Sequence, residues 1–166
     1  MLHICSEMYW YIFFIVVAIS LYALLYYIFP NDLVLYQTDL AHFDLSMLHN
    51  KQPIIIEDQV QDPGEILDSW FNVNFIEEAI ATNIWTRNNY KYLLICSNAE
   101  LSEITLCPAG STPETSIELT TIKLKNNKIL IVPFKYYFNI QGSVRMYGVD
   151  DYITYGLKMF SNERAV

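Results

Sequence analysis

The hydrophobic pattern of this chain falls into one long apolar run followed by many short ones. Residues 8–29 (MYWYIFFIVVAISLYALLYYIF) contain no charged side chain, and their only polar members are Ser20 and the tyrosines. A helix of that length rises roughly 33 Å at ~1.5 Å per residue, enough to cross a ~30 Å hydrocarbon core. Pro30 ends the run, because proline lacks the N–H that a helix needs. We therefore predict a transmembrane helix over residues 8–29 and a single-pass membrane protein.

Aromatic side chains gather at both ends of this run, where amphipathic rings favour the headgroup layer of a bilayer. A cleaved signal peptide fits poorly, because the first basic residue is Lys51 and no small-residue cleavage site follows. The remaining alternative is a helix buried in a globular core. Orientation stays open, since no basic residue flanks the run. The residues predicted to lie at the two bilayer interfaces are Tyr9, Trp10, Tyr11, Tyr26, Tyr27 and Phe29.

Four segments follow from the pattern: a short tail (1–7), the anchor (8–29), a stalk (30–51) and one domain (52–166). The stalk is too apolar for a free linker and has no clear period, so we expect it to be partly ordered and to pack on the domain or on a partner. Residues 54–56 are three consecutive isoleucines after Gln52-Pro53, which is typical of a buried strand.

Two short helices are predicted at the start of the domain. Asp62-Pro63-Gly64-Glu65 has the residues of a helix N-terminus, with Asp62 as the cap and Pro63 in the first turn. Apolar residues recur at helical spacing after it, over residues 66–71 and again over residues 75–84. The break near residues 72–74 divides the two helices.

From Tyr90 onward the apolar residues follow strand patterns. Strands are predicted over residues 90–95, 101–106, 116–124, 129–132, 136–140 and 144–149, with a further one over 153–157. Residues 125–128 (KNNK) suit a hairpin turn that needs a positive φ. About eight short strands after two helices predict a mainly β domain with a β-sandwich or barrel architecture and helical additions.

Charge and cysteine content narrow the classes of partner. The 166 residues carry a net charge of −8, which disfavours binding to nucleic-acid phosphates. Three cysteines are too few for a disulfide-stapled domain, and their spacing does not match a zinc site. Cys96 and Cys107 lie on neighbouring predicted strands, where they are either buried free thiols or a pair. Adjacent carboxylates at Glu77-Glu78 and Asp150-Asp151 are expected to be solvated.

Two segments carry a resemblance to a known family. Residues 51–58 (KQPIIIED) and residues 130–139 (LIVPFKYYFN) resemble the opening strand and a late strand of cupin-like, JmjC-like double-stranded β-helix proteins. The resemblance implies a jelly-roll fold. Where that family places a metal-binding histidine, this chain has Phe138. The abundance of Ile, Asn and Tyr also resembles proteins of large nucleocytoplasmic DNA viruses.

A non-haem iron site needs two histidines and a carboxylate on one face of the metal. The candidates are His42, Asp44 and His49, but all three precede the first predicted strand of the domain. No nucleophile, phosphate-binding or dinucleotide motif is present either. We therefore predict a degenerate member of the family with no cofactor, no metal and no catalytic residue.

Aromatic residues make up 15% of the chain, and a group of them lies in its last third: Tyr136, Tyr137, Phe138, Tyr147, Tyr152 and Tyr155. Tyrosine supplies contact area at low entropic cost, so Tyr147, Tyr152, Tyr155 and Phe160 form a candidate protein-contact surface. The hypothesis is a membrane-anchored structural protein, a minor virion component that tethers a membrane to capsid proteins. The alternatives are a membrane-anchored Fe(II)/2-oxoglutarate oxygenase and a glycan- or ligand-binding β-sandwich.

Overall fold

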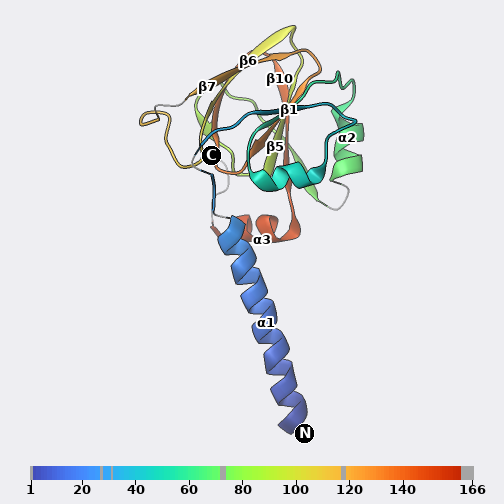
Figure 1. Cartoon of the computed structure of the whole chain (residues 1–166), viewed down its shortest axis with the longest axis vertical. Helices are drawn as coiled ribbons and strands as arrows, with labels where there is room; N and C mark the ends of the chain where they lie inside the picture. The colour runs from blue at the N-terminus through green and yellow to red at the C-terminus, as the bar shows by residue number, and fades with distance from the viewer. Residues whose placement is uncertain (1, 27, 31, 72–73, 117–118, 162–166) are drawn as a thin grey trace.

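A single helix projects from a β-rich domain (Figure 1). The computed structural model describes residues 2–26, 28–30, 32–71, 74–116 and 119–161. The projecting helix is α1 (Leu2–Tyr26). The other elements are β1 (Tyr36–Thr38), the 3₁₀ helix η1 (Leu45–Asn50), β2 (Ile54–Ile56), α2 (Pro63–Trp70), β3 (Phe75–Ala79), β4 (Thr86–Arg87), β5 (Tyr92–Ser97), β6 (Leu101–Cys107), β7 (Thr120–Lys125), β8 (Ile129–Pro133), β9 (Tyr137–Gln141), β10 (Val144–Asp150) and α3 (Tyr152–Ser161).

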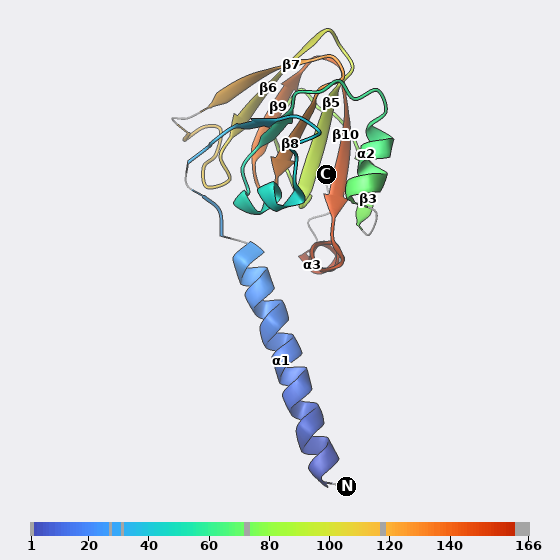
Figure 2. The same ribbon diagram turned by 45° about the vertical axis from the view of Figure 1, so that its right-hand side comes forward.

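The strands form two sheets that face each other (Figure 2). One sheet has six strands in the order β1-β2-β8-β5-β10-β3, and the other has four in the order β4-β9-β6-β7. From β3 to β10 the chain crosses repeatedly between the sheets, an order compatible with a jelly roll. The mainly β part of the predicted fold is therefore observed, with ten described strands in place of about eight.

The space between the sheets is filled by aliphatic and aromatic side chains. Strands β5 and β8 contribute inward residues from the larger sheet, including Leu93 and Leu130, and β6 and β9 contribute Ile104 and Phe138 from the smaller one. Burying this apolar surface stabilises the domain by ~25 cal/mol per Å² removed from water. The interior of the sandwich is thus a packed core.

A second apolar cluster covers the outer face of the six-stranded sheet. Ile54, Ile56 and Ile131 point to this side, where α2 and η1 pack over them. Because both faces of the sheet are covered, β5 and β8 are buried along nearly their whole length. β7 lies in the other sheet and alternates between buried and exposed residues, since its outer face meets solvent. The domain therefore has three layers: helices, a larger sheet and a smaller sheet.

The turn and the helix cap predicted from local sequence signals are present in the structure. Asp62 caps α2 by accepting a hydrogen bond from the Gly64 amide at 2.9 Å, and Pro63 occupies the first turn. Asn127 has a φ of 61° in the β7–β8 hairpin, as the KNNK turn requires. The buried strands at residues 54–56 and 129–132 are confirmed.

Two predicted elements are wrong. Residues 75–84 were expected to form a helix, but Phe75–Ala79 is strand β3, paired antiparallel with β10. Pairing with a distant strand outweighs the local helical spacing, and Ile80 and Ile84 stay 87% and 69% exposed instead of joining a core. Residues 153–157 were expected to form a strand but lie in α3.

The prediction of a transmembrane helix over residues 8–29 is contradicted. Among the residues whose side chains the structure describes, no helix has both the length and the apolar character to cross a bilayer. The single-pass membrane assignment, and the interface roles given to the aromatic residues at the two ends, are corrected with it.

The predicted stalk contributes to the sheet and to its cover. Tyr36–Thr38 forms β1, which pairs in parallel with β2 at the edge of the six-stranded sheet. Leu48 of η1 is 3% exposed and belongs to the outer cluster. Residues 36–50 are therefore part of the folded domain.

Candidate functional site

The centre of the sandwich is apolar where the family resemblance would place a metal. Phe138, at the position of the expected histidine, is 3% exposed and packs between the sheets. Within the described part of the chain, no group of three or more His, Cys, Asp or Glu residues is placed to hold a metal ion. The chemistry of this interior is that of a hydrophobic core.

The three metal candidates from the sequence each have a local role near η1. His42 contacts Asp39 through Nδ1 at 2.6 Å, and this contact helps to lower the pKa of the Asp39 carboxyl. Asp44 caps η1 by accepting a hydrogen bond from the Ser46 amide at 2.8 Å, which lowers the pKa of Asp44. His49 Nδ1 lies 3.1 Å from the Ser46 carbonyl oxygen. The structure does not bring these three side chains together as a ligand set.

Cys96 and Cys107 are buried free thiols on β5 and β6. Burial raises the pKa of Cys96 to about 12 and also raises that of Cys107. Neither sulfur is therefore an activated thiolate nucleophile near neutral pH.

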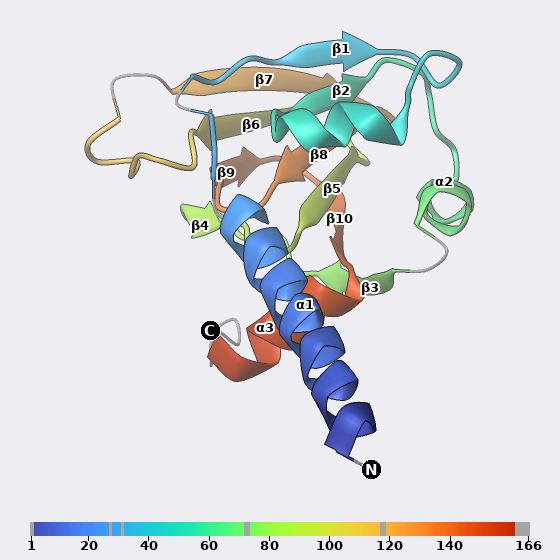
Figure 3. The same ribbon diagram turned by 60° about the horizontal axis from the view of Figure 1, so that its bottom comes forward.

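The C-terminal end of α1 lies near α3 at the base of the sandwich (Figure 3). A cluster of polar side chains joins α1 to the domain there. Lys91 immediately precedes β5, and its ammonium group donates hydrogen bonds to Asp151 Oδ2 at 2.6 Å and to Tyr22 Oη at 2.9 Å. Tyr22, from α1, also donates to Asp151 Oδ2. These three residues lie far apart in the sequence, so only the tertiary fold assembles them. We refer to Tyr22, Lys91 and Asp151 as the junction triad.

The electrostatics of the junction triad favour the charged ion pair. Burial by itself would raise the pKa of Asp151, but hydrogen bonds from Lys91, the Thr154 amide and Tyr22 lower it to about 2. Burial would lower the pKa of Lys91, yet the bonds to Asp151 and Tyr22 raise it above its ordinary value. Burial and the hydrogen bond to Asp151 raise the pKa of Tyr22, so the phenol is a neutral donor.

Asp151 is also the cap of α3. Its Oδ1 accepts from the Thr154 amide at 2.7 Å, while the Thr154 hydroxyl oxygen accepts from the Asp151 amide at 3.0 Å. This reciprocal cap starts the helix that was predicted as a strand. One carboxylate therefore fixes the start of α3, the ammonium group before β5 and the tyrosine of α1.

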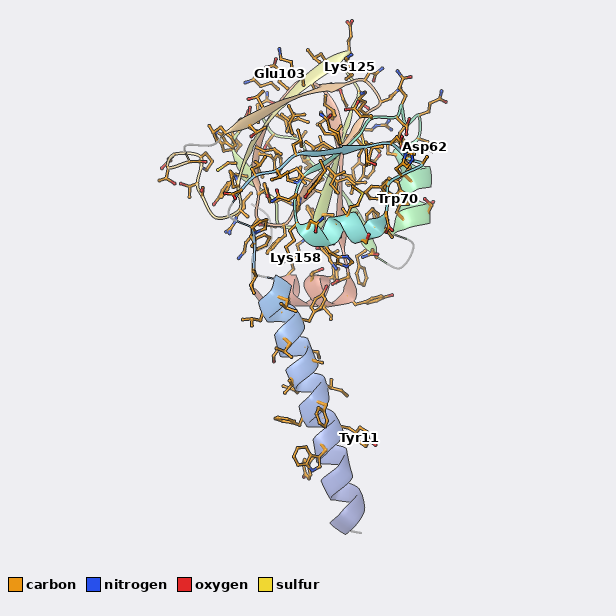
Figure 4. All side chains as sticks on the ribbon, in the orientation of Figure 1. Tyr11, Asp62, Trp70, Glu103, Lys125 and Lys158 are labelled. Atoms are coloured by element: carbon orange, nitrogen blue, oxygen red, sulfur yellow. The ribbon has the colours of Figure 1, made fainter. Side chains whose placement is uncertain are left out.

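The neighbouring Asp150 is 3% exposed. It accepts hydrogen bonds from the Lys91 amide at 2.8 Å and from the Lys158 ammonium at 2.6 Å. The Lys158 ammonium lies 3.6 Å from the centre of the Tyr90 ring, between the sandwich and α3 (Figure 4). The expectation that this pair is solvated is therefore wrong for Asp150, which is buried, whereas Asp151 is half-buried and paired with Lys91.

The C-terminal end of α1 is held by a second lysine. Lys51 adopts a left-handed conformation (φ 51°) after η1, and its ammonium donates to the carbonyl oxygens of Leu25 and Ile28. A cation at this end of a helix complements the helix dipole. The Phe29 ring lies 6.1 Å from that of Phe134, with the Lys51 ammonium 4.9 Å from its centre. Phe29, predicted at a bilayer interface, thus contacts the domain.

A pocket of about 580 Å³ lies between this end of α1 and the domain. Its walls include Leu25, Ile28, Leu48 and Phe134, and its basic groups are His49, Lys51 and Lys91. Carboxylates are absent from the described residues that line it. The volume lies within the ~300–1,000 Å³ typical of small-molecule sites.

The candidate contact tyrosines pack in two different places, two of them against Phe75 of β3 and the third against the outer cluster. Tyr152 is 71% exposed, with its ring edge-on to that of Phe75, and Tyr155 stacks on the same Phe75 ring at 4.2 Å. Tyr147 is half-buried and packs against the outer cluster. The Phe160 side chain lies outside the described residues.

No family model, curated protein sequence or solved structure matches this chain. The site is therefore argued from its own residues. Sequence reasoning missed the junction triad, although one signal was present. Asp151 stands three residues before Thr154, the spacing of a helix cap, and this spacing alone could have indicated α3.

Proposed function

We propose that the protein is a structural interaction protein that assembles through α1, with further copies of this chain as its first partners. The observation that carries the proposal is the exposure of α1. Every side chain from Tyr9 to Val16 is a large apolar residue, and each is at least half exposed. Consecutive helical positions are 100° apart, so these eight residues cover the whole circumference of the helix.

A helix that is apolar on all faces is normally buried on all faces. Among the described residues, the contacts between the domain and α1 lie at the C-terminal end of the helix, and they involve Tyr22, Lys51 and the pocket walls. The rest of the helix projects away from the domain, with Tyr11 directed outward (Figure 4). Copies of α1 can cover one another, because residues 8–29 carry no charge and so no like-charge repulsion between the helices.

Two features of the domain support a role as a scaffold. Its interior is filled by core side chains, and its base holds the C-terminal end of α1. Phe138 and the other core residues fill the space between the two sheets. The junction triad and Lys51 connect α1 to the sandwich at two points. A rigid connection of this kind sets the direction in which each domain faces within an assembly.

Sedimentation velocity of the purified full-length chain tests the proposal. We expect species larger than the 19.4 kDa monomer, and a shift toward monomer in the double variant Phe13→Gln, Val16→Gln. Glutamine keeps a high helix propensity, so the variant changes polarity more than helix stability. The matched control is Ile80→Gln, Ile84→Gln, which removes two exposed apolar residues of the domain and should leave assembly unchanged.

Two results would overturn the proposal. One is a wild-type chain that stays monomeric at all concentrations. The other is a chain that makes no complex with itself and is instead taken up by neutral lipid vesicles in a manner that depends on Phe13 and Val16.

The virion hypothesis from the sequence stays a prediction, without the membrane tether that the structure contradicts. Its check is co-purification of the protein with detergent-stripped particles, and absence from virions would contradict it. The oxygenase alternative predicts iron binding that is lost in His42→Ala or Asp44→Ala, and the glycan-binding alternative predicts signal on a glycan array.

A further inference from the structure

We propose that two copies of this chain also pair edge to edge, with strand β3 of one domain added to the free edge of strand β7 in another. The inference goes beyond the assembly proposed for α1, because it concerns the sandwich alone. It rests on the length of the free sheet edges and on the charges that those edges carry.

The two sheets end in four strands of unequal length. Their order puts β1 and β3 at the ends of the larger sheet, and β4 and β7 at the ends of the smaller one. β1 and β4 contain three and two residues, whereas β3 contains five and β7 contains six. On its free side an edge strand presents amide and carbonyl groups that can bind another strand. β3 and β7 therefore offer the longest edges for such an addition.

The edge strand β7 carries lysines on the outer face of the smaller sheet. Its residues alternate, so Ile122 and Leu124 are buried in the core whereas Lys123 and Lys125 are exposed. Lys123 lies 3.6 Å from Glu103 of β6 and stays 68% exposed, so its ammonium can also meet a carboxylate on the free side of β7. Two copies of β7 side by side would bring their lysines together, which disfavours the pairing of this edge with itself.

The edge strand β3 carries the opposite charge. Glu77 and Glu78 are both exposed, although the Tyr90 hydroxyl donates a long hydrogen bond to Glu77 Oε2 at 3.5 Å. Successive residues of a strand point to opposite faces of the sheet. One glutamate therefore lies on the lysine side of β7, whichever face of β3 continues that side. Opposite charges across neighbouring strands stabilise their pairing, whereas two copies of β3 would repel each other.

The two edges lie on opposite sides of the domain (Figure 2, Figure 3). β7 of one copy can therefore receive β3 of a second copy while its own β3 joins a third. A contact between two different surfaces of this kind is heterologous and builds rings or open chains. Each copy has a net charge of −8, which repels other copies at long range, so we expect a weak contact that forms at high protein concentration.

Sedimentation velocity over a range of protein concentrations tests the proposal. The parent is the full-length variant Phe13→Gln, Val16→Gln, so that the result does not depend on contacts through α1. We expect reversible association of this parent that weakens as the ionic strength rises. The variant Lys123→Glu, Lys125→Glu should associate at least ~10-fold more weakly, because like charges then meet across the edge.

Reversal of the other edge separates local charge from net charge. Glu77→Lys, Glu78→Lys should weaken association by the same factor, although it makes the whole chain less negative. A 1:1 mixture of the two reversed variants should associate again, since each presents the edge charge that the other lacks. Asp68→Lys, an exposed reversal on α2, is the control and should not weaken association. Hydrogen exchange should show new protection of amides in β3 and β7 in the associated samples.

Four outcomes would overturn the inference. They are a parent that stays monomeric at all concentrations, reversed variants that associate as well as the parent, a mixture that stays monomeric although each variant keeps a native circular dichroism spectrum, and association without new amide protection in the two strands. Failure of the assembly through α1 leaves this test unaffected, because both edges belong to the sandwich.

Discussion

The projecting helix and the larger sheet are both built from uncharged apolar runs, yet they differ completely in what covers them. Ile131 of β8 is 0% exposed, whereas Ile15 of α1 is 59% exposed. The chain supplies the cover of β8 itself, through α2, η1 and the second sheet. Over residues 9–16 of α1, the described part of the chain leaves every side chain at least half exposed. Similar apolar runs therefore stabilise the fold in one region and leave an exposed apolar surface in the other, the surface that we propose binds further copies of the chain.

The largest expected effect comes from the covered region. Ile131→Ala should lower the free energy of unfolding by about 2–5 kcal/mol, because it leaves a cavity in the outer cluster. Ile15→Ala is the matched change in α1 and should alter it by less than ~0.5 kcal/mol. Urea denaturation followed by circular dichroism measures both. If both variants lowered the free energy of unfolding equally, Ile15 would contribute to the stability of the fold as much as Ile131, and the contrast between the two regions would be wrong.

A smaller loss is expected at the closest packing contact of β10. A Cβ on Gly148 would lie 2.2 Å from the Tyr90 ring, which is itself covered by the Lys158 ammonium. Gly148→Ala should therefore destabilise the domain by about 1–3 kcal/mol, as expected for overpacking. The double variant Gly148→Ala, Tyr90→Ala should show a favourable coupling energy in thermal unfolding. Additive losses would mean that the ring is not the obstacle.

The junction triad predicts a pH-dependent effect of about 1–2 kcal/mol, between the values for exposed and buried ion pairs. The pKa of Asp151 is about 2 in the folded chain, below the ~3.9 of an unfolded aspartate. Its contribution is therefore present above pH ~4 and is lost as the pH falls toward 2. Asp151→Asn keeps a residue that caps helices well, so the variant removes mainly the charge.

Chemical denaturation at pH 7 and at pH 3 checks this prediction. The difference between wild type and Asp151→Asn should be largest at pH 7 and smaller at pH 3. Asp68→Asn, an exposed change on α2, is the control and should show little effect at either pH. If Asp151→Asn lowers the free energy of unfolding by the same amount at both pH values, the Asp151–Lys91 ion pair does not contribute to stability.

Strand patterns, turns and caps within a few residues were readable in the sequence. The aliphatic runs at residues 54–56 and 129–132 indicated buried strands, and the KNNK segment indicated a turn. For the same reason, the predicted bounds of β5, β6 and β10 lie within two residues of the observed ones. These features depend on side chains that are close together along the chain, so they can be predicted from one sequence alone.

The long-range features came from the tertiary structure alone. Residues 75–79 form a strand because β10 pairs with them. Asp150 is buried and Asp151 is half-buried because Lys91 reaches both from a distant segment. The pocket forms only where the end of α1 meets η1 and β8. The sequence by itself determined which segments are apolar, but the arrangement of the sheets decided which of them the chain covers, because burial depends on neighbours far away along the sequence.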